Sequence, residues 1–137
     1  YYLENNKNNI PTGKLINVEG TYYDFRKFER IGDFIQKKGS GFDENFIIRS
    51  KSKLVARLLS KKNKIELSLY SNQPGVQFYT GQHLKYHSKN KIIKKYQGLC
   101  LETQFYPNSP NNKKFPSTLI TPNNTYNHNM RFVIKEF

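Results

Sequence analysis

The sequence has few of the residues that stabilise exported or membrane-embedded chains. It contains one cysteine, one methionine and no tryptophan in 137 residues. The single Cys100 cannot form an internal disulfide, so nothing argues for an oxidising compartment, and we expect a cytoplasmic location. No run approaches the roughly 18–20 apolar residues that a membrane helix needs, and no signal-peptide pattern opens the chain. We therefore expect no association with a membrane.

Acidic residues are also scarce. Aspartate and glutamate number 10 against 23 lysines and arginines, which gives a net charge of +13 at pH 7. Such an excess invites a nucleic-acid hypothesis. However, the lysines fall in small groups beside Gly, Ser, Asn and Pro, where turns are expected. We interpret them as solvated loop tips and do not expect a nucleic-acid partner. The groups include Lys37-Lys38, Lys61-Lys62, Lys94-Lys95 and Lys113-Lys114.

Aromatic residues and short alternating segments are what the sequence does provide. Tyrosine and phenylalanine supply 15% of the chain, so aromatic side chains are expected to carry the packing of one core. Helical spacing of apolar residues occurs only over 25–35. Alternation of apolar and polar residues predicts an antiparallel all-β protein. The expected strands span residues 45–48, 54–59, 64–70, 76–80, 99–104 and 126–134.

Polar segments between these strands predict the connections. Residues 49–53 are expected to join the first two strands as a hairpin, and residues 60–63 to join the second and third. Residues 72–75 (NQPG) are a strong turn signal before the strand at 76–80. The chain begins at Tyr1 rather than Met, from which we expect that further residues precede it.

A carboxylate stands in the middle of the strand predicted at 99–104. Alternation places Leu101 on one face of that strand and Glu102 on the other. A poorly solvated carboxylate has a perturbed pKa unless it is paired, and proton-transfer residues are commonly made this way. The alternative is that Glu102 pairs with a lysine or lies at a solvent-facing edge.

Two further positions offer polar groups suited to carbohydrate. Gln77 and Tyr79 share a strand face directly after the Pro74-Gly75 turn. Amides and phenols beside a carboxylate offer hydrogen bonds to hydroxyls and a flat surface to a sugar ring. Asp43 opens the segment before a predicted strand, where an Asx-type turn is the alternative role.

The histidines and the single cysteine predict no metal site. His83, His87 and His128 have no ligand-like spacing with Cys100 or with one another, and we expect all three at the surface. A glycine-rich phosphate loop and a nucleophile elbow are likewise absent from the sequence.

Seven short segments, spread nearly from end to end, form a recognisable series. They are residues 10–13 (IPTG), 24–26 (DFR), 31–32 (IG), 41–46 (GFDENF), 73–80 (QPGVQFYT), 99–104 (LCLETQ) and 115–117 (FPS). In this order they resemble the C-terminal half of the aldose 1-epimerase (galactose mutarotase) family. The resemblance implies that residues 1–137 are the C-terminal portion of one domain whose N-terminal portion is absent. It also implies a fold that is part of a large antiparallel β-sandwich.

The resemblance also implies an activity and its residues. The family interconverts the α and β anomers of galactose and glucose without a cofactor, by acid–base catalysed ring opening. Glu102 matches the family's catalytic base, Asp43 its sugar-binding aspartate, and Gln77 a glutamine of the same pocket. Arg26 and Gly41 match framework positions with no assigned chemistry.

The family's acid is a histidine in a His-x-Tyr-Phe-Asn-like segment, which this chain lacks. We therefore expect the isolated chain to be inactive and to require its missing half or another protein as a partner. Two alternatives stay open. One is a non-catalytic, epimerase-like structural or interaction subunit of a larger assembly, and the other is an enzyme for phosphorylated sugars.

Overall fold

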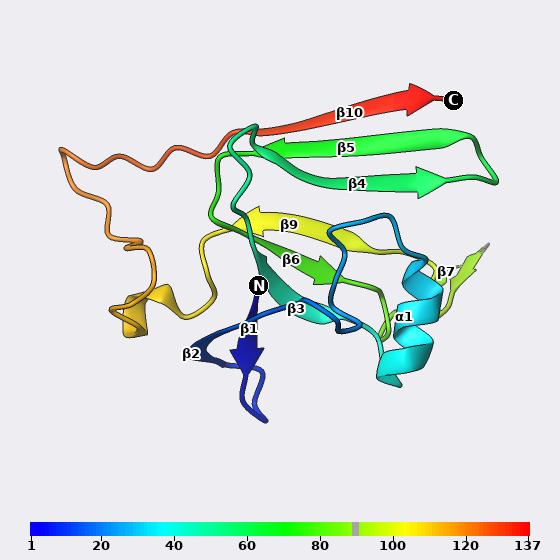
Figure 1. Ribbon diagram of the computed structural model, residues 1–137, viewed down its shortest axis with the longest axis horizontal. Helices are drawn as coiled ribbons and strands as arrows, with labels where there is room; N and C mark the ends of the chain where they lie inside the picture. The colour runs from blue at the N-terminus through cyan, green and yellow to red at the C-terminus, as the bar shows by residue number, and fades with distance from the viewer. Residues whose placement is uncertain (89–90) are drawn as a thin grey trace. The chain divides into compact units, whose positions relative to one another are not determined.

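The computed structural model describes residues 1–88 and 91–137, and it divides into two compact units. Unit 1 comprises residues 1–47 and 77–102, and unit 2 comprises residues 48–76 and 103–137. The elements are β1 (Tyr2–Asn5), β2 (Pro11–Ile16), α1 (Ile31–Lys38), β3 (Asp43–Ile47), β4 (Leu54–Ser60), β5 (Ile65–Ser71), β6 (Gly75–Tyr79), β7 (Tyr86–Ser88), β8 (Lys91–Ile93), β9 (Cys100–Gln104), the 3-10 helix η1 (Ser109–Asn111) and β10 (Met130–Glu136) (Figure 1). The expected all-β class is confirmed.

A five-stranded sheet in the order β2-β1-β3-β6-β9 positions the predicted site residues Asp43, Gln77 and Glu102. Two backbone bonds fix the pairing of its central strands. The amide of Thr80 donates to the carbonyl of Phe42 at 3.0 Å, and the amide of Ile48 donates to that of Pro74 at 2.9 Å. These bonds run in opposite chain directions, so β3 and β6 are antiparallel.

One face of this sheet is covered by aromatic residues. Phe34 of α1, Phe42 before β3 and Phe78 of β6 are all buried and form the centre of the core. The rings of Phe42 and Phe78 stack with centroids 5.6 Å apart, while Phe25 meets Phe78 edge-on at 5.5 Å. Offset and edge-on contacts of this kind add to the stabilisation from burial alone. Aromatic side chains therefore carry the packing, as predicted.

Helix α1 begins later than the sequence pattern predicted. The expected helix covered 25–35, but α1 spans Ile31–Lys38, and Phe25 lies in the preceding loop. The Asp24 carboxylate accepts the backbone amide of Arg26 at 3.3 Å, and this local bond competes with helix formation. Gly39 ends the helix in the left-handed conformation (φ 77°), donating its amide to the carbonyls of Ile35 and Gln36.

Unit 2 contains a three-stranded antiparallel sheet in the order β10-β5-β4 (Figure 1). The hairpin predicted across residues 60–63 is confirmed, because β4 pairs with β5 from Leu54↔Tyr70 to Ser60↔Ile65. The hairpin predicted across residues 49–53 is wrong. β3 and β4 belong to different sheets, since β3 pairs with β1 and β6 while β4 pairs only with β5 among the described strands.

Strand β10 also starts later than predicted, at Met130 rather than at Tyr126. The side-chain amides of Asn72 and Gln73 donate to the carbonyl of Asn127 at 3.1 and 3.2 Å. This carbonyl therefore bonds to side chains and not to a neighbouring strand. Along β10, Met130, Phe132 and Ile134 are each at least 49% exposed. Phe132 lies opposite Leu69 of β5, and Ile134 lies opposite Leu67. The exposed apolar side chains of β10 therefore share a sheet face with these two leucines.

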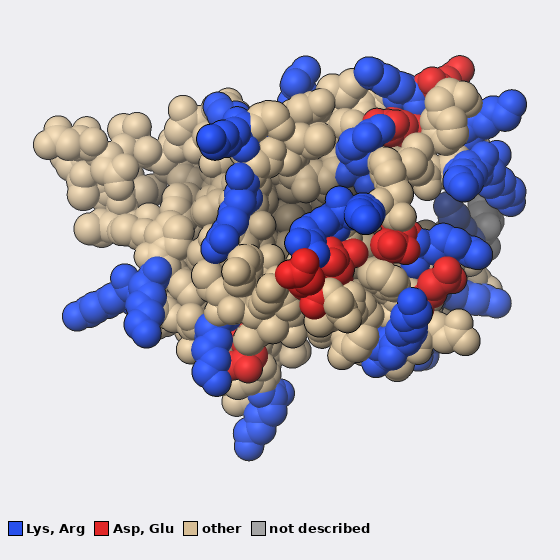
Figure 2. Space-filling view, viewed as in Figure 1, with Lys and Arg blue, Asp and Glu red and all other residues tan. Residues whose placement is uncertain are grey.

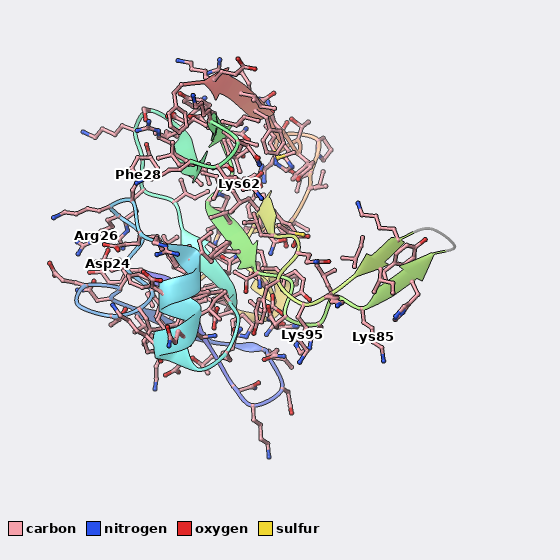
Figure 3. All side chains as sticks on the ribbon, turned by 90° about the vertical axis from the view of Figure 1, so that its right-hand side faces the viewer. Asp24, Arg26, Phe28, Lys62, Lys85 and Lys95 are labelled. Atoms are coloured by element: carbon pink, nitrogen blue, oxygen red, sulfur yellow. The ribbon has the colours of Figure 1, made fainter. Side chains whose placement is uncertain are left out.

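Basic side chains are scattered over the face shown in Figure 2, without a single continuous patch. Lys85 directly precedes β7 and Lys95 follows β8 by two residues, so both exposed lysines lie near the base of the two-stranded β7–β8 hairpin (Figure 3). This distribution agrees with the interpretation of the lysines as solvated loop residues. In the part of the chain that the structure describes, no helix combines the length and apolar character needed to cross a bilayer.

Candidate functional site

Asp43 and Gln77 meet on the sheet face opposite the aromatic core. Asp43 is the first residue of β3, and Gln77 is the central residue of β6. Their neighbours Glu44 and Phe78 point to the helix-covered face, so alternation turns Asp43 and Gln77 the other way. Gln77 Nε2 donates to Asp43 Oδ1 at 2.9 Å. The structure thus brings together two of the three predicted site residues.

Glu102 lies on the same sheet face, on the neighbouring strand β9. Leu101, the residue before it, packs against the aromatic core, so Glu102 points away from that core, as alternation predicted. Its side chain is exposed, and among residues 1–88 and 91–137 it has no hydrogen bond or ion pair. Of the two interpretations of Glu102, the poorly solvated carboxylate is therefore wrong for this chain, and the solvent-facing edge is the one that the structure shows. β9 is the last strand of its sheet, so a neighbouring strand flanks it on one side only and its other edge is open to solvent.

Sequence reasoning missed a further polar residue on this face, Asn45. It lies between Asp43 and Ile47 on β3 and is only 2% exposed. Neither Oδ1 nor Nδ2 of Asn45 has a hydrogen-bond partner, and Gln77 Oε1 is buried without one as well. The segment GFDENF contained the signal, since Asn45 is two residues from Asp43 and so shares its face.

The backbone of Asp43 is held by an ionic cluster on the core side of the sheet. Glu44 Oε2 accepts the Asp43 amide at 2.7 Å, and Glu44 Oε1 lies 2.8 Å from Lys38 Nζ. Lys38 also donates to the carbonyl of Gly41 at 2.6 Å, and Tyr23 donates its hydroxyl to Glu44 at 3.3 Å. Burial, and secondly the Glu44 charge, raise the pKa of Tyr23, so its hydroxyl stays a donor at neutral pH.

The structure explains the residues at the two framework positions, Gly41 and Arg26. A Cβ on Gly41 would lie 2.5 Å from Gln82 Oε1 and 2.7 Å from Thr80 Oγ1, so a larger residue there would force these two side chains to shift. Arg26 makes a two-pronged bond to Asp24, with both nitrogen–oxygen distances 2.7 Å (Figure 3). These bonds hold the pKa of Asp24 down, from 3.8 to about 2.

A hollow of about 570 Å³ in unit 1 adjoins this site at Asp43 but includes neither Gln77 nor Glu102. Its walls carry aromatic and charged groups, among them Tyr23, Lys38 and Glu44. Tyr23 and Lys38 both bond to Glu44, so these polar groups already have partners. We therefore place the candidate chemistry on the sheet face and not in this hollow.

The three histidines are exposed, as predicted. His128 bonds through Nε2 to Thr103 Oγ1 at 2.8 Å and through Nδ1 to the Tyr126 hydroxyl at 3.1 Å, both within unit 2. Within the described residues, no three His, Cys, Asp or Glu side chains gather as a possible metal site.

The sheet carries the Asp43–Gln77 pair on β3 and β6 and the carboxylate of Glu102 on the next strand, β9. This arrangement defines an all-β protein with a candidate acid–base site. Residues 1–133 match the model of the aldose 1-epimerase family. The chain belongs to the aldose 1-epimerase family.

Individual relatives agree with this assignment. The chain is 41% identical to galactose mutarotase of Mus musculus, in a match covering 96% of this chain and 40% of the mutarotase. It is 34% identical to aldose 1-epimerase of Escherichia coli (strain K12), covering 84% of this chain and 36% of that enzyme. The chain thus spans about two fifths of the length of these relatives.

Solved structures show the same fold. An aldose epimerase homologue from C. elegans superimposes with a TM-score of 0.84 at 23% identity, covering 98% of this chain and 43% of that one. Galactose 1-epimerase from Lactobacillus acidophilus gives a TM-score of 0.69 at 25% identity, and the match covers 99% of this chain and 41% of that enzyme.

Proposed function

We propose that the complete protein carrying this chain interconverts the α and β anomers of galactose or glucose. The observation that carries the proposal is the Asp43–Gln77 pair, bonded at 2.9 Å on the sheet face that also presents Glu102. These residues stand in segments that resemble the family, and residues 1–133 match its model.

The reaction needs two proton movements around one sugar. A base removes the proton from the anomeric hydroxyl while an acid protonates the ring oxygen, and the bond between C1 and the ring oxygen breaks to leave an aldehyde. Rotation about C1–C2 followed by closure, with both protons returned, gives the other anomer. Holding the sugar between the two groups supplies much of the acceleration.

Each residue has a role in this proposal. Glu102 is the base, and its exposed carboxylate, unpaired among the described residues, is free to meet a sugar hydroxyl. Asp43 accepts a hydrogen bond from another hydroxyl, with the oxygen that Gln77 does not use. Gln77 holds the Asp43 carboxylate and lies beside it on the same sheet face.

The acid is supplied from outside residues 1–137 in this proposal. By family resemblance these residues form the C-terminal portion of one domain, and the acid histidine belongs to its N-terminal portion. None of His83, His87 or His128 takes that role, because none of them stands in a segment that resembles the acid's.

Polarimetry on the complete protein tests the proposal. We expect addition of the protein to accelerate the equilibration of freshly dissolved α-galactose. Asp43→Asn replaces a charged acceptor by a neutral one, so KM should rise about 10- to 100-fold, the value of one charge-assisted bond. An equilibration rate equal to that of buffer would contradict the proposal.

A second candidate is a non-catalytic subunit of a larger assembly. The apolar row Met130, Phe132 and Ile134 on β10 favours it, because exposed apolar side chains in a strand suit a protein contact. Under this alternative the complete protein leaves galactose equilibration unchanged, while Phe132→Ser weakens its association with partners.

A further inference from the structure

Asn45 is buried in a way that costs stability unless its amide bonds to something. Its side chain is 2% exposed, and both of its polar atoms lack a partner. Desolvating an amide without a hydrogen bond is unfavourable, so an Asn at such a position calls for a role beyond filling space. Valine or threonine would suit a buried strand position better.

The pairing of the strands places Asn45 directly beside Gln77. The two backbone bonds that bracket β3 and β6 join Phe42 to Thr80 and Ile48 to Pro74. Counting inward from either bond sets Asn45 opposite Gln77. Cross-strand neighbours have Cβ atoms about 4.5–5.5 Å apart, within reach of two amide side chains. On its other side Asn45 faces Leu3 of β1, because Tyr2 pairs with Phe46.

The chemistry of Asp43 dictates which way the Gln77 amide points. An ionised carboxylate only accepts hydrogen bonds, so Gln77 must turn its nitrogen towards Asp43, as it does at 2.9 Å. The Gln77 oxygen then points away from Asp43, and it is buried without a donor. Asn45, at the neighbouring position across the strand pair, has a donor, Nδ2, that bonds to no acceptor.

We propose that Asn45 is a positioning residue that acts through Gln77. A rotation of the Asn45 side chain lets Nδ2 donate to Gln77 Oε1, which fixes the orientation of the Gln77 amide and thereby the oxygen that Asp43 presents to the sugar. The order of bonds is Asn45 to Gln77 to Asp43, with every hydrogen pointing towards the carboxylate. This inference rests on the proposed function, and Asn45 itself does not touch the sugar.

An isosteric pair of variants separates the donor from the shape of Asn45. Asn45→Val and Asn45→Thr have nearly the same volume and both suit a strand, but only threonine keeps a donor. In the complete protein, Asn45→Val should raise KM for galactose about 3- to 10-fold, the effect of one neutral hydrogen bond, and change kcat less than KM. Asn45→Thr should recover part of that loss. Leu3→Val, on the other side of Asn45, is the control and should leave KM unchanged.

A double-mutant cycle tests whether the effect passes through Gln77. In a Gln77→Leu background, Asn45→Val should raise KM no further, because the group it orients is gone. The same rise in KM in both backgrounds, or no rise in the wild-type background, would overturn the proposal.

A spectroscopic measurement keeps this inference separate from the enzymatic one. In the wild-type protein the side-chain amide protons of Gln77 should exchange slowly with solvent, and Asn45→Val should speed their exchange while Leu3→Val does not. If the wild type fails to equilibrate galactose, the proposed function fails, yet this exchange measurement still decides whether Asn45 holds Gln77. Unchanged exchange in Asn45→Val would refute the link.

Discussion

The bond between Asp24 and Arg26 gives a pH-dependent prediction whose size follows from the structure. The bond lowers the pKa of Asp24 from 3.8 to about 2. A shift of about 1.8 units corresponds to at most about 2.5 kcal/mol of folding free energy. The Arg26 side chain is 58% exposed and so well screened, which reduces the expected contribution to about 1 kcal/mol.

The sign follows from the depressed pKa. A carboxyl group that is more acidic when folded stabilises the fold above its unfolded pKa, and this contribution is lost as the pH falls through the folded value. Asp24→Asn should therefore lower the free energy of unfolding by about 1 kcal/mol at pH 6. The difference from wild type should shrink below about pH 4, where the unfolded chain begins to bind the proton, and vanish only below about pH 2.

Urea unfolding of the complete protein at pH 6, 4 and 2.5 measures this difference. Arg26→Lys is the matched control, because it keeps the charge but loses the two-pronged geometry, and it should cost part of the same stability. A difference between Asp24→Asn and wild type that stays constant from pH 6 to 2.5 would refute the electrostatic reasoning and point to packing instead.

Three further substitutions probe how the fold holds Asp43. Gly41→Ala would push against Thr80, which accepts the Phe42 amide, so we expect a loss of about 1–3 kcal/mol in urea unfolding together with a higher KM. Phe42→Ala removes the centre of the aromatic core and should cost about 3–5 kcal/mol, lowering Tm by calorimetry. Lys38→Met leaves the half-buried Glu44 without its cation and should cost about 2–3 kcal/mol, whereas Lys38→Arg should cost less.

Local patterns predicted the elements whose partners are close in sequence. The β4–β5 hairpin, the strand after the Pro74-Gly75 turn, and the alternation around Glu102 all depend on spacing within a few residues. The helix was misplaced because Phe25 has helical spacing but packs against Phe78 from a loop, which only the tertiary structure reveals.

Long-range pairing is what the sequence could not supply. The false hairpin between residues 45–48 and 54–59 arose because adjacent strands pair most often, whereas β3 pairs with β1 and with β6. Strands β1, β2, β7 and β8 were missed because each is short or mixed in polarity. Asp43 and Gln77 were selected separately, and their bond across 34 positions appears only in the folded chain.

Replacement of Glu102 by glutamine tests the account most directly. The side chain is exposed and unpaired within the described residues, so Glu102→Gln should leave the circular dichroism spectrum and Tm of the complete protein unchanged. Removing the general base should slow galactose equilibration about 100-fold or more, measured by polarimetry. An equilibration rate within a few-fold of wild type would show that the base is another residue.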